Sequence, residues 1–275
     1  MTTESKSVVN QELILAARKG LIPVRQHTRL GGFGNLLRKE LGQWWGTRTW
    51  WVQTLICVLI LNGITTIVAL TEEFTPGEKL QEVVQTFLPM AVIVVGIVVI
   101  ITAQGAIVGE KELGTAAWAM SKPASRSAFI LSKIIGYTVG LSISAILVPA
   151  TIFYIEMRLL LPSPLPFVPF LAGVALALLS LVFYVVLTLM LGTLFNSRGP
   201  VAGIGIAMIM TGMLLKSLIP LEVMLFTPWL FPDLSGALAL EMPLPPVWFV
   251  PIVAVSCWII VMTAVALFRF QREEF

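Results

Sequence analysis

The hydrophobic positions of the chain fall into six long runs that are separated by polar or proline-rich segments. A helix that crosses a hydrocarbon core of about 30 Å needs about 20 mostly apolar residues. The runs of suitable length are approximately Trp50–Leu70, Phe87–Val108, Ala128–Ile155, Phe167–Leu194, Pro200–Ile219 and Val247–Phe268. The pattern therefore predicts an all-α integral membrane protein with six transmembrane helices.

The basic residues lie mainly in the segments that such a topology places on one side of the membrane. They are concentrated in the N-terminal segment, in residues 107–136, at Arg198 and after the last run, at Arg269 and Arg272. Because loops that keep positive charge tend to stay cytoplasmic, we expect a multi-pass cell (inner or plasma) membrane protein with both termini in the cytoplasm. Residues 109–127 then form the largest internal cytoplasmic loop.

Residues 36–49 show a helical rather than a continuous apolar pattern. Leu37, Leu41, Trp44 and Trp45 recur at helical spacing, and the charged residues expected on the other side are Arg38, Lys39 and Glu40. This pattern predicts an amphipathic helix in the inner headgroup region, with residues 1–35 as a cytoplasmic N-terminal extension and 36–275 as the membrane domain. The alternative is that the tryptophans are only the aromatic belt of the first span.

Residues 226–246 are apolar but are interrupted by five prolines, Pro228, Pro232, Pro243, Pro245 and Pro246. Proline breaks a helix, so the segment is too interrupted to span. We expect short helices that dip back into the membrane from the outer face before the last span, with their free backbone groups covered by protein. A plain surface loop is the alternative.

Composition excludes several kinds of chemistry. The chain is 57% hydrophobic and 12% charged, with His27 as its only histidine and Asp233 as its only aspartate. Metal-protease pairs and Ser/His/Asp triads cannot be assembled from these residues, and no Gly-rich loop with the phosphate-binding lysine is present. We expect no catalytic residues, no metal and no cofactor bound by this chain, and its net charge of +3 is too small to indicate nucleic acid.

The interiors of the six runs contain no carboxylate that would couple transport to protons or sodium. The polar groups considered as a candidate pathway are Asn62, Thr66, Thr102 and Gln104. They are either substrate contacts or interhelical hydrogen-bonding groups. If the protein moves a substrate uphill, we expect the energy to come from a partner.

One charged segment carries a recognisable pattern. Its residues are Glu110, Lys111, Glu112, Gly114, Thr115, Pro123, Ser125, Arg126 and Lys133. This order resembles the cytoplasmic loop of the membrane subunits of type-2 ATP-binding-cassette (ABC) exporters. Residues 36–49 are similar to the elbow helix of that family, and the segment 226–246 and the basic C-terminal end are also similar.

The resemblance implies a permease subunit that pairs with a second permease chain, identical or not, in the membrane lipid. Two copies of a separate ATPase subunit, which uses ATP and Mg²⁺, would bind the coupling loop 109–127. The resemblance also implies that the elbow helix and the first, second and fifth spans tilt to change access. Two other readings stay open: a membrane anchor or scaffold that recruits a cytoplasmic protein, and an ATP-independent transporter or channel.

Overall fold

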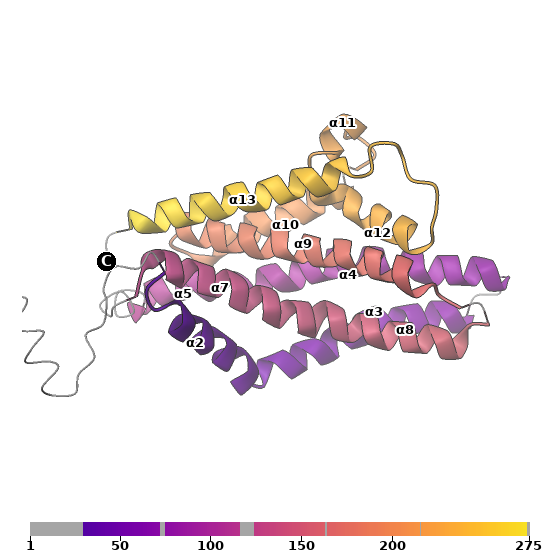
Figure 1. The fold of residues 1–275 in the computed structure, drawn as a ribbon, viewed down its shortest axis with the longest axis horizontal. Coiled ribbons are helices and arrows are strands. Elements are labelled where there is room, and N and C mark those ends of the chain that lie inside the picture. Colours follow the sequence, from indigo (N-terminus) through magenta and orange to yellow (C-terminus); the bar gives the residue numbers. More distant parts are fainter. Residues whose placement is uncertain (1–29, 72–74, 116–123, 163, 215, 274–275) are drawn as a thin grey trace, which may run out of the picture.

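A computed structural model describes residues 30–71, 75–115, 124–162, 164–214 and 216–273, and the part of the chain that it describes is helical with no strand (Figure 1). The helices are α2 (Phe33–Gly46), α3 (Thr49–Thr71), α4 (Pro76–Ala103), α5 (Gly105–Glu112), α7 (Arg126–Leu141), η1 (Ser142–Leu147), α8 (Val148–Leu160), α9 (Phe167–Leu194), α10 (Arg198–Leu214), α11 (Leu221–Met224), η2 (Pro228–Leu230), α12 (Phe231–Ala239) and α13 (Val250–Gln271).

Five helical segments are long and apolar enough to cross a membrane. They are Thr49–Leu70, Gly77–Glu112, Arg126–Leu160, Phe167–Leu194 and Val250–Gln271. The predicted fifth span corresponds to α10, an apolar helix of 17 residues. The protein is thus an all-helical, multi-pass membrane protein. Its second long helix begins at Pro76, about three turns before the predicted start at Phe87, because Thr75 and Glu78 form a capping box there.

The third long segment is a single rod made of α7, η1 and α8. Its middle, η1, is a π-helix that ends just before Pro149. Proline has no N–H to donate to the carbonyl four residues earlier, and its ring crowds that carbonyl. The local widening of the helix accommodates the proline without breaking the rod.

Residues 226–246 form the short helices that their prolines predict. The 3₁₀ turn η2 leads into α12, which packs against α4 and α9. Phe231 at the start of α12 is fully buried, and at Gly173 on α9 an added methyl group would lie 2.6 Å from the carbonyl oxygen of Ser235. The absence of a side chain at Gly173 is therefore what lets α12 lie directly on α9.

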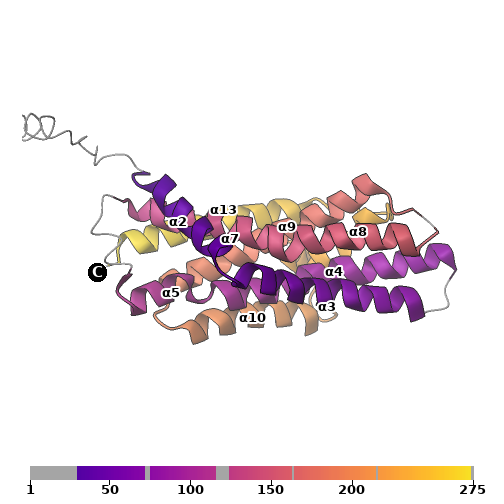
Figure 2. The same cartoon turned by 90° about the horizontal axis from the view of Figure 1, so that it is seen from below.

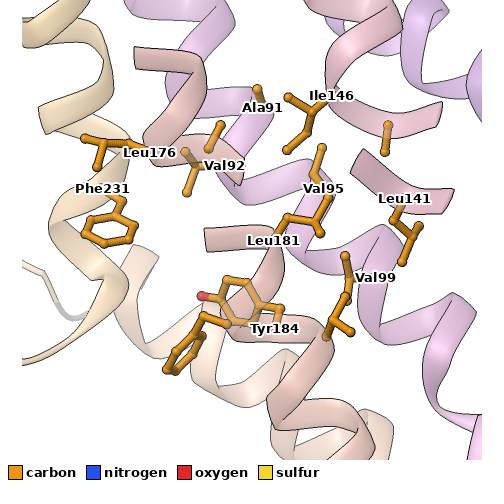
Figure 3. Close-up of a cluster of buried hydrophobic side chains, with 14 of the residues drawn as sticks. Ala91, Val92, Val95, Val99, Leu141, Ile146, Leu176, Leu181, Tyr184 and Phe231 are labelled. Atoms are coloured by element: carbon orange, nitrogen blue, oxygen red, sulfur yellow. The ribbon is translucent and has the colours of Figure 1, made fainter. Parts of the chain in front are cut away.

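The core is built around α9, the most buried of the long helices. Leu176, Leu181 and Tyr184 of α9 face Val95 of α4 and Phe231 of α12 (Figure 3). The other long helices keep apolar side chains on their outer surfaces, as on α3 and α13. In water such exposed apolar faces would be unfavourable, whereas lipid chains accommodate them.

Seen along the bundle, α2, α5, the start of α7 and the end of α13 gather at one end, which we call the loop end (Figures 1 and 2). The turn after α10 and the start of α13 lie toward the other end, which we call the far end. Figure 2 shows α3, α4, α5 and α10 on one side of the bundle.

Candidate functional site

The predicted loop begins and ends in well-defined caps. Helix α5 ends at Glu112 because Gly114 adopts a left-handed conformation (φ 66°) and donates its N–H to the carbonyl of Lys111 at 3.1 Å. The hydroxyl of Thr115 donates to the carbonyl of Glu110 at 3.3 Å. Helix α7 begins after Ser125, whose Oγ accepts the N–H of Ala128 at 3.1 Å. Pro123 lies outside the described residues.

Four charged side chains from three elements meet beside this loop, and we call them the four-charge cluster: Lys39 and Glu40 of α2, Glu110 of α5 and Lys133 of α7. The Nζ of Lys133 lies 2.7 Å from Oε1 of Glu110 and 3.2 Å from Oε1 of Glu40. The Nζ of Lys39 lies 3.1 Å from the same oxygen of Glu110. Two cations and two carboxylates therefore balance one another across three helices.

The members of the cluster differ sharply in burial. The side chain of Lys133 is 3% exposed and that of Glu40 is 7% exposed, whereas that of Lys39 is 40% exposed. A buried ammonium group needs compensating partners, because removing it from water costs several kcal/mol. Lys133 has two carboxylates and also lies over the ring of Phe129, 5.0 Å from its centroid. This lysine is thus the centre that holds the cluster together.

Helix α2 reaches the cluster because α7 presents glycines to it. An added methyl group at Gly136 would lie 2.9 Å from Cβ of Glu40, and one at Gly140 would lie 2.4 Å from the indole of Trp44. Trp44 also packs edge-on against Tyr137 at 5.7 Å between ring centroids. The prediction that Glu40 lies on the exposed side of α2 was wrong, since the side chain points into this contact and pairs with the buried lysine.

The other residues of α2 follow the amphipathic pattern more closely. Arg38 is exposed, and Trp45 is 37% exposed with an edge-on contact to Trp50 at 5.3 Å between centroids. Helix α2 is therefore both a surface helix and a packing partner of α7. Its place in the headgroup region stays a prediction.

Two further loop residues contact the C-terminal end of the chain. The guanidinium of Arg126 donates to the carbonyls of Gln271, at 2.5 Å, and of Glu273, at 2.8 Å. The Nζ of Lys111 lies 2.9 Å from a carboxylate oxygen of Glu273 and donates to the carbonyl of Thr193 at 3.2 Å. Arg126 and Lys111 thus connect both sides of the loop to the ends of α9 and α13.

Glu112 pairs with the start of α10. Its Oε2 lies 3.2 Å from Nη2 of Arg198, and both side chains are substantially exposed. The same guanidinium packs over Gly105 and Gly109, where added methyl groups would lie 3.5 Å and 3.1 Å from it. The exposed pair itself adds little stability, but it places the start of α10 against α5.

The four candidate pathway residues do not converge on one cavity. Asn62 is buried and donates to the carbonyl of Pro149 at 3.1 Å and to Glu156 at 3.3 Å, and Thr66 donates to Glu156 at 3.4 Å. These bonds favour the interhelical reading, with Asn62 and Thr66 fastening α3 to α8.

Thr102 and Gln104 lie near the loop end of the second long helix. Thr102 donates to the carbonyl of Val98 at 2.7 Å, and it lines a groove between α3 and α4. Gln104 donates to the carbonyl of Ile101 at 3.1 Å at the break between α4 and α5. Thr102 therefore lies at a cavity of about 430 Å³, next to Ile101 and Gln53.

Sequence reasoning missed Glu273, Glu40 as a partner of Lys133, and Arg198 as a partner of Glu112. Glu40 and Lys133 are separated by 93 residues along the chain, and Glu112 and Arg198 by 86. A basic residue at the buried position of a span was the available signal, because such a residue usually has a carboxylate partner.

Across the residues that the structure describes, no group of three or more His, Cys, Asp or Glu side chains could hold a metal ion. The ion pairs and hydrogen bonds of these charged residues join α2, α5, α7, α9, α10 and α13 at the loop end.

Fold and site together define a multi-pass helical membrane protein whose loop end is fastened by ion pairs. The chain belongs to the family described as "Protein of unknown function (DUF2705)", whose model matches residues 49–275. The match covers α3 through α13 and begins after α2. A search among curated proteins found no match to the chain.

Proposed function

We propose that this chain is the membrane-spanning permease subunit of an ABC exporter. In this proposal two permease chains form the translocation path, and a separate ATPase subunit binds each chain at the loop 109–127. The observation that carries the proposal is the four-charge cluster, because it joins both sides of the loop to the helices that would have to move.

The cluster and the caps give the loop a mechanical connection to the membrane helices. Helix α5 continues the second long helix with a single-residue break, and α7 continues into α8. A force applied to the loop therefore acts directly on two membrane helices. Lys133 passes it to α2 through Glu40, and Arg126 passes it to the end of α13. Charge-assisted hydrogen bonds are strong enough to keep these elements together while they move.

The positions of the two ends of the membrane domain support a six-span topology. Helix α2 precedes α3 at the loop end, and α13 ends there (Figure 1). A chain that enters and leaves on the same side crosses an even number of times, so the five long segments need α10 as a sixth crossing. Its 17 residues extend about 25 Å, which a slightly thinned bilayer accommodates. Both termini are then cytoplasmic by the distribution of basic residues.

The surface of α10 supports pairing with a second permease chain. At Gly199 and Gly203, added methyl groups would meet no atom within 4 Å. In membranes, small residues at four-residue spacing let helices approach closely. An α10 that is covered on one side by α4 and α9 and open at these glycines is suited to a contact between subunits.

Co-purification tests the proposed docking. Leu113 at the loop is 77% exposed, and Leu218 at the far end is also 77% exposed, so Leu113→Asp and Leu218→Asp make a matched pair. We expect wild type and the Leu218 variant to bring down a soluble protein with a phosphate-binding lysine loop from native membranes. The Leu113 variant should recover at least about tenfold less, since a central apolar contact of an interface contributes about 2 kcal/mol.

Comparing the Leu113 and Leu218 variants distinguishes a loss of ATPase docking from a loss of folding. Neither leucine is buried, so both variants should be recovered in equal amounts and with the same melting temperature. Equal recovery of the ATPase by both variants would contradict docking at the loop. Absence of any ATPase in the wild-type preparation would favour the scaffold or the ATP-independent transporter.

A further inference from the structure

A groove of about 430 Å³ runs between α3 and α4 at the loop end. Its lining is mostly apolar and includes Val52, Ile56 and Ile101, and its polar residues include Arg48, Thr49 and Thr102. Arg48 and Thr49 lie at the start of α3, whereas Ile56 lies about two turns further along that helix. On the α3 side the lining thus begins with polar residues and becomes more apolar, as a lipid does from headgroup to acyl chain.

Gln53 supplies an independent sign of a missing ligand. It is 9% exposed and lines this groove, and its Nε2 has no hydrogen-bond partner among the described residues. A buried amide donor without a partner is unfavourable, so such groups usually bond to protein, water or a ligand. Nε2 itself is closed to solvent, so an ester or phosphate oxygen in the groove would satisfy this donor once the amide turns toward the groove.

The charge of the lining indicates the sign of the ligand. Arg48 is exposed and is the single charged residue that lines the groove, and the contacts of the described chain include no acidic partner for its guanidinium. Guanidinium groups bind phosphate oxygens in a bidentate manner. Arg48 therefore favours an anionic ligand at the polar end of the groove.

A second hollow of about 220 Å³ adjoins the polar end, since Thr49 and Thr102 line both. Its wall includes Gln43 and Thr47, and its acidic residue, Glu40, is neutralised by Lys133. This space can receive a polar headgroup without placing an uncompensated negative charge beside it.

We propose that the groove binds an anionic phospholipid. Its phosphate lies at Arg48, a carbonyl oxygen of its ester lies at Gln53, and its acyl chain follows Val52, Ile56 and Ile101. This site is additional to the proposed transport function and does not depend on an ATPase, because it requires only that α3 and α4 lie in the membrane. The lipid joins α3 to α4 where α2 leaves the bundle.

Lipid binding to the purified full chain tests the charge preference. After delipidation in mild detergent, phosphatidylglycerol or phosphatidylcholine with the same acyl chains is added in about 150 mM salt, and bound lipid is counted by native mass spectrometry. We expect wild type to prefer phosphatidylglycerol about fivefold, the effect of one basic residue near an anionic headgroup. Arg48→Gln should lose this preference. The matched control Arg38→Gln, an exposed arginine outside the groove, should keep it.

A second pair of variants tests the groove itself. Ile101→Trp fills the apolar wall and should reduce binding of both lipids, whereas Leu59→Trp, on the exposed surface of α3, should not. Gln53→Leu should weaken lipid binding and, in delipidated protein, leave the melting temperature equal or higher because a buried unpaired donor is removed.

Three results would overturn the proposal. One is equal binding of the two lipids by wild type, and another is an equal loss of preference in the Arg38 and Arg48 variants. The third is a lipid-free dimer that Ile101→Trp dissociates, which would show that a second copy of the chain covers the groove. Failure of ATPase docking at Leu113 leaves all of these expectations unchanged.

Discussion

Replacing Lys133 by methionine is the sharpest test of the four-charge cluster. The substitution keeps an unbranched side chain, one atom shorter, and removes the buried cation that contacts both Glu40 and Glu110. It leaves two carboxylates facing a site in which the lysine side chain was only 3% exposed. The cluster would then hold two negative charges and one partly exposed positive charge.

The expected effect follows from burial. Removing one partner of a buried ion pair typically destabilises a protein by about 3–5 kcal/mol. Lys39, 3.1 Å from Glu110, still compensates part of the charge, so we take the lower end, about 3 kcal/mol. For a chain of this size, 1 kcal/mol corresponds to about 2–4 °C in melting temperature. Lys133→Met should therefore lower the melting temperature by about 6–12 °C.

Thermal unfolding of the detergent-purified chain, followed by tryptophan fluorescence, measures this change. Lys39→Met is the matched control, because it removes a cation from the same cluster at a side chain that is 40% exposed. Exposed ion pairs contribute at most about 1 kcal/mol, so the control should shift the midpoint by no more than about 4 °C. Adding Glu40→Gln and Glu110→Gln to Lys133→Met should recover part of the loss, since it removes the unpaired charges.

The reasoning is refuted if Lys133→Met and Lys39→Met melt within about 2 °C of one another. It is also refuted if the neutralised triple variant is no more stable than Lys133→Met. Either result would mean that the buried position of Lys133 does not make its charge structurally important.

Two further substitutions test the packing at the loop end. Gly140→Ala should lower the melting temperature by an amount equivalent to about 1–3 kcal/mol, because its methyl group would lie 2.4 Å from the indole of Trp44. The control Gly63→Ala, whose methyl group would meet no atom within 4 Å, should be neutral or stabilising, and equal shifts would contradict the close packing of α2 on α7. Phe270→Ala should lower the free energy of unfolding by about 3–5 kcal/mol, because the ring is fully buried and stacked on Phe129. The control Phe268→Ala, at a ring that is 55% exposed, should lower the melting temperature much less in the same assay, and a larger loss from Phe268 would contradict the placement of α13.

The long apolar runs could be predicted from the sequence because a membrane helix is specified locally. Runs of about 20 apolar residues have few other stable forms in lipid, so the long helices appear where the pattern predicts them. The short helices after Thr227 followed from their prolines in the same way. The capped ends at Ser125 and Gly114 were also local, since each depends on residues within one turn.

The contacts of the site could not be predicted because they are not local. Nothing in the spacing of residues 36–49 distinguishes Glu40, which is buried, from Lys39, which is 40% exposed. The difference arises because Gly136 and Gly140 leave room on α7 for one side of α2. The π-helix η1 did have a local signal, Pro149 inside an apolar run, but the proline alone predicts a disturbance and not its form.

The central claim is that a cytoplasmic ATPase docks on the loop at residues 109–127. The most direct measurement places a photo-crosslinking amino acid at Leu113 and, in a second variant, at Leu218, and identifies the adducts formed in native membranes. Our account predicts an adduct from position 113 with a soluble protein that carries a phosphate-binding lysine loop, and no such adduct from position 218. An ATPase adduct from both positions, or from neither, would contradict the account.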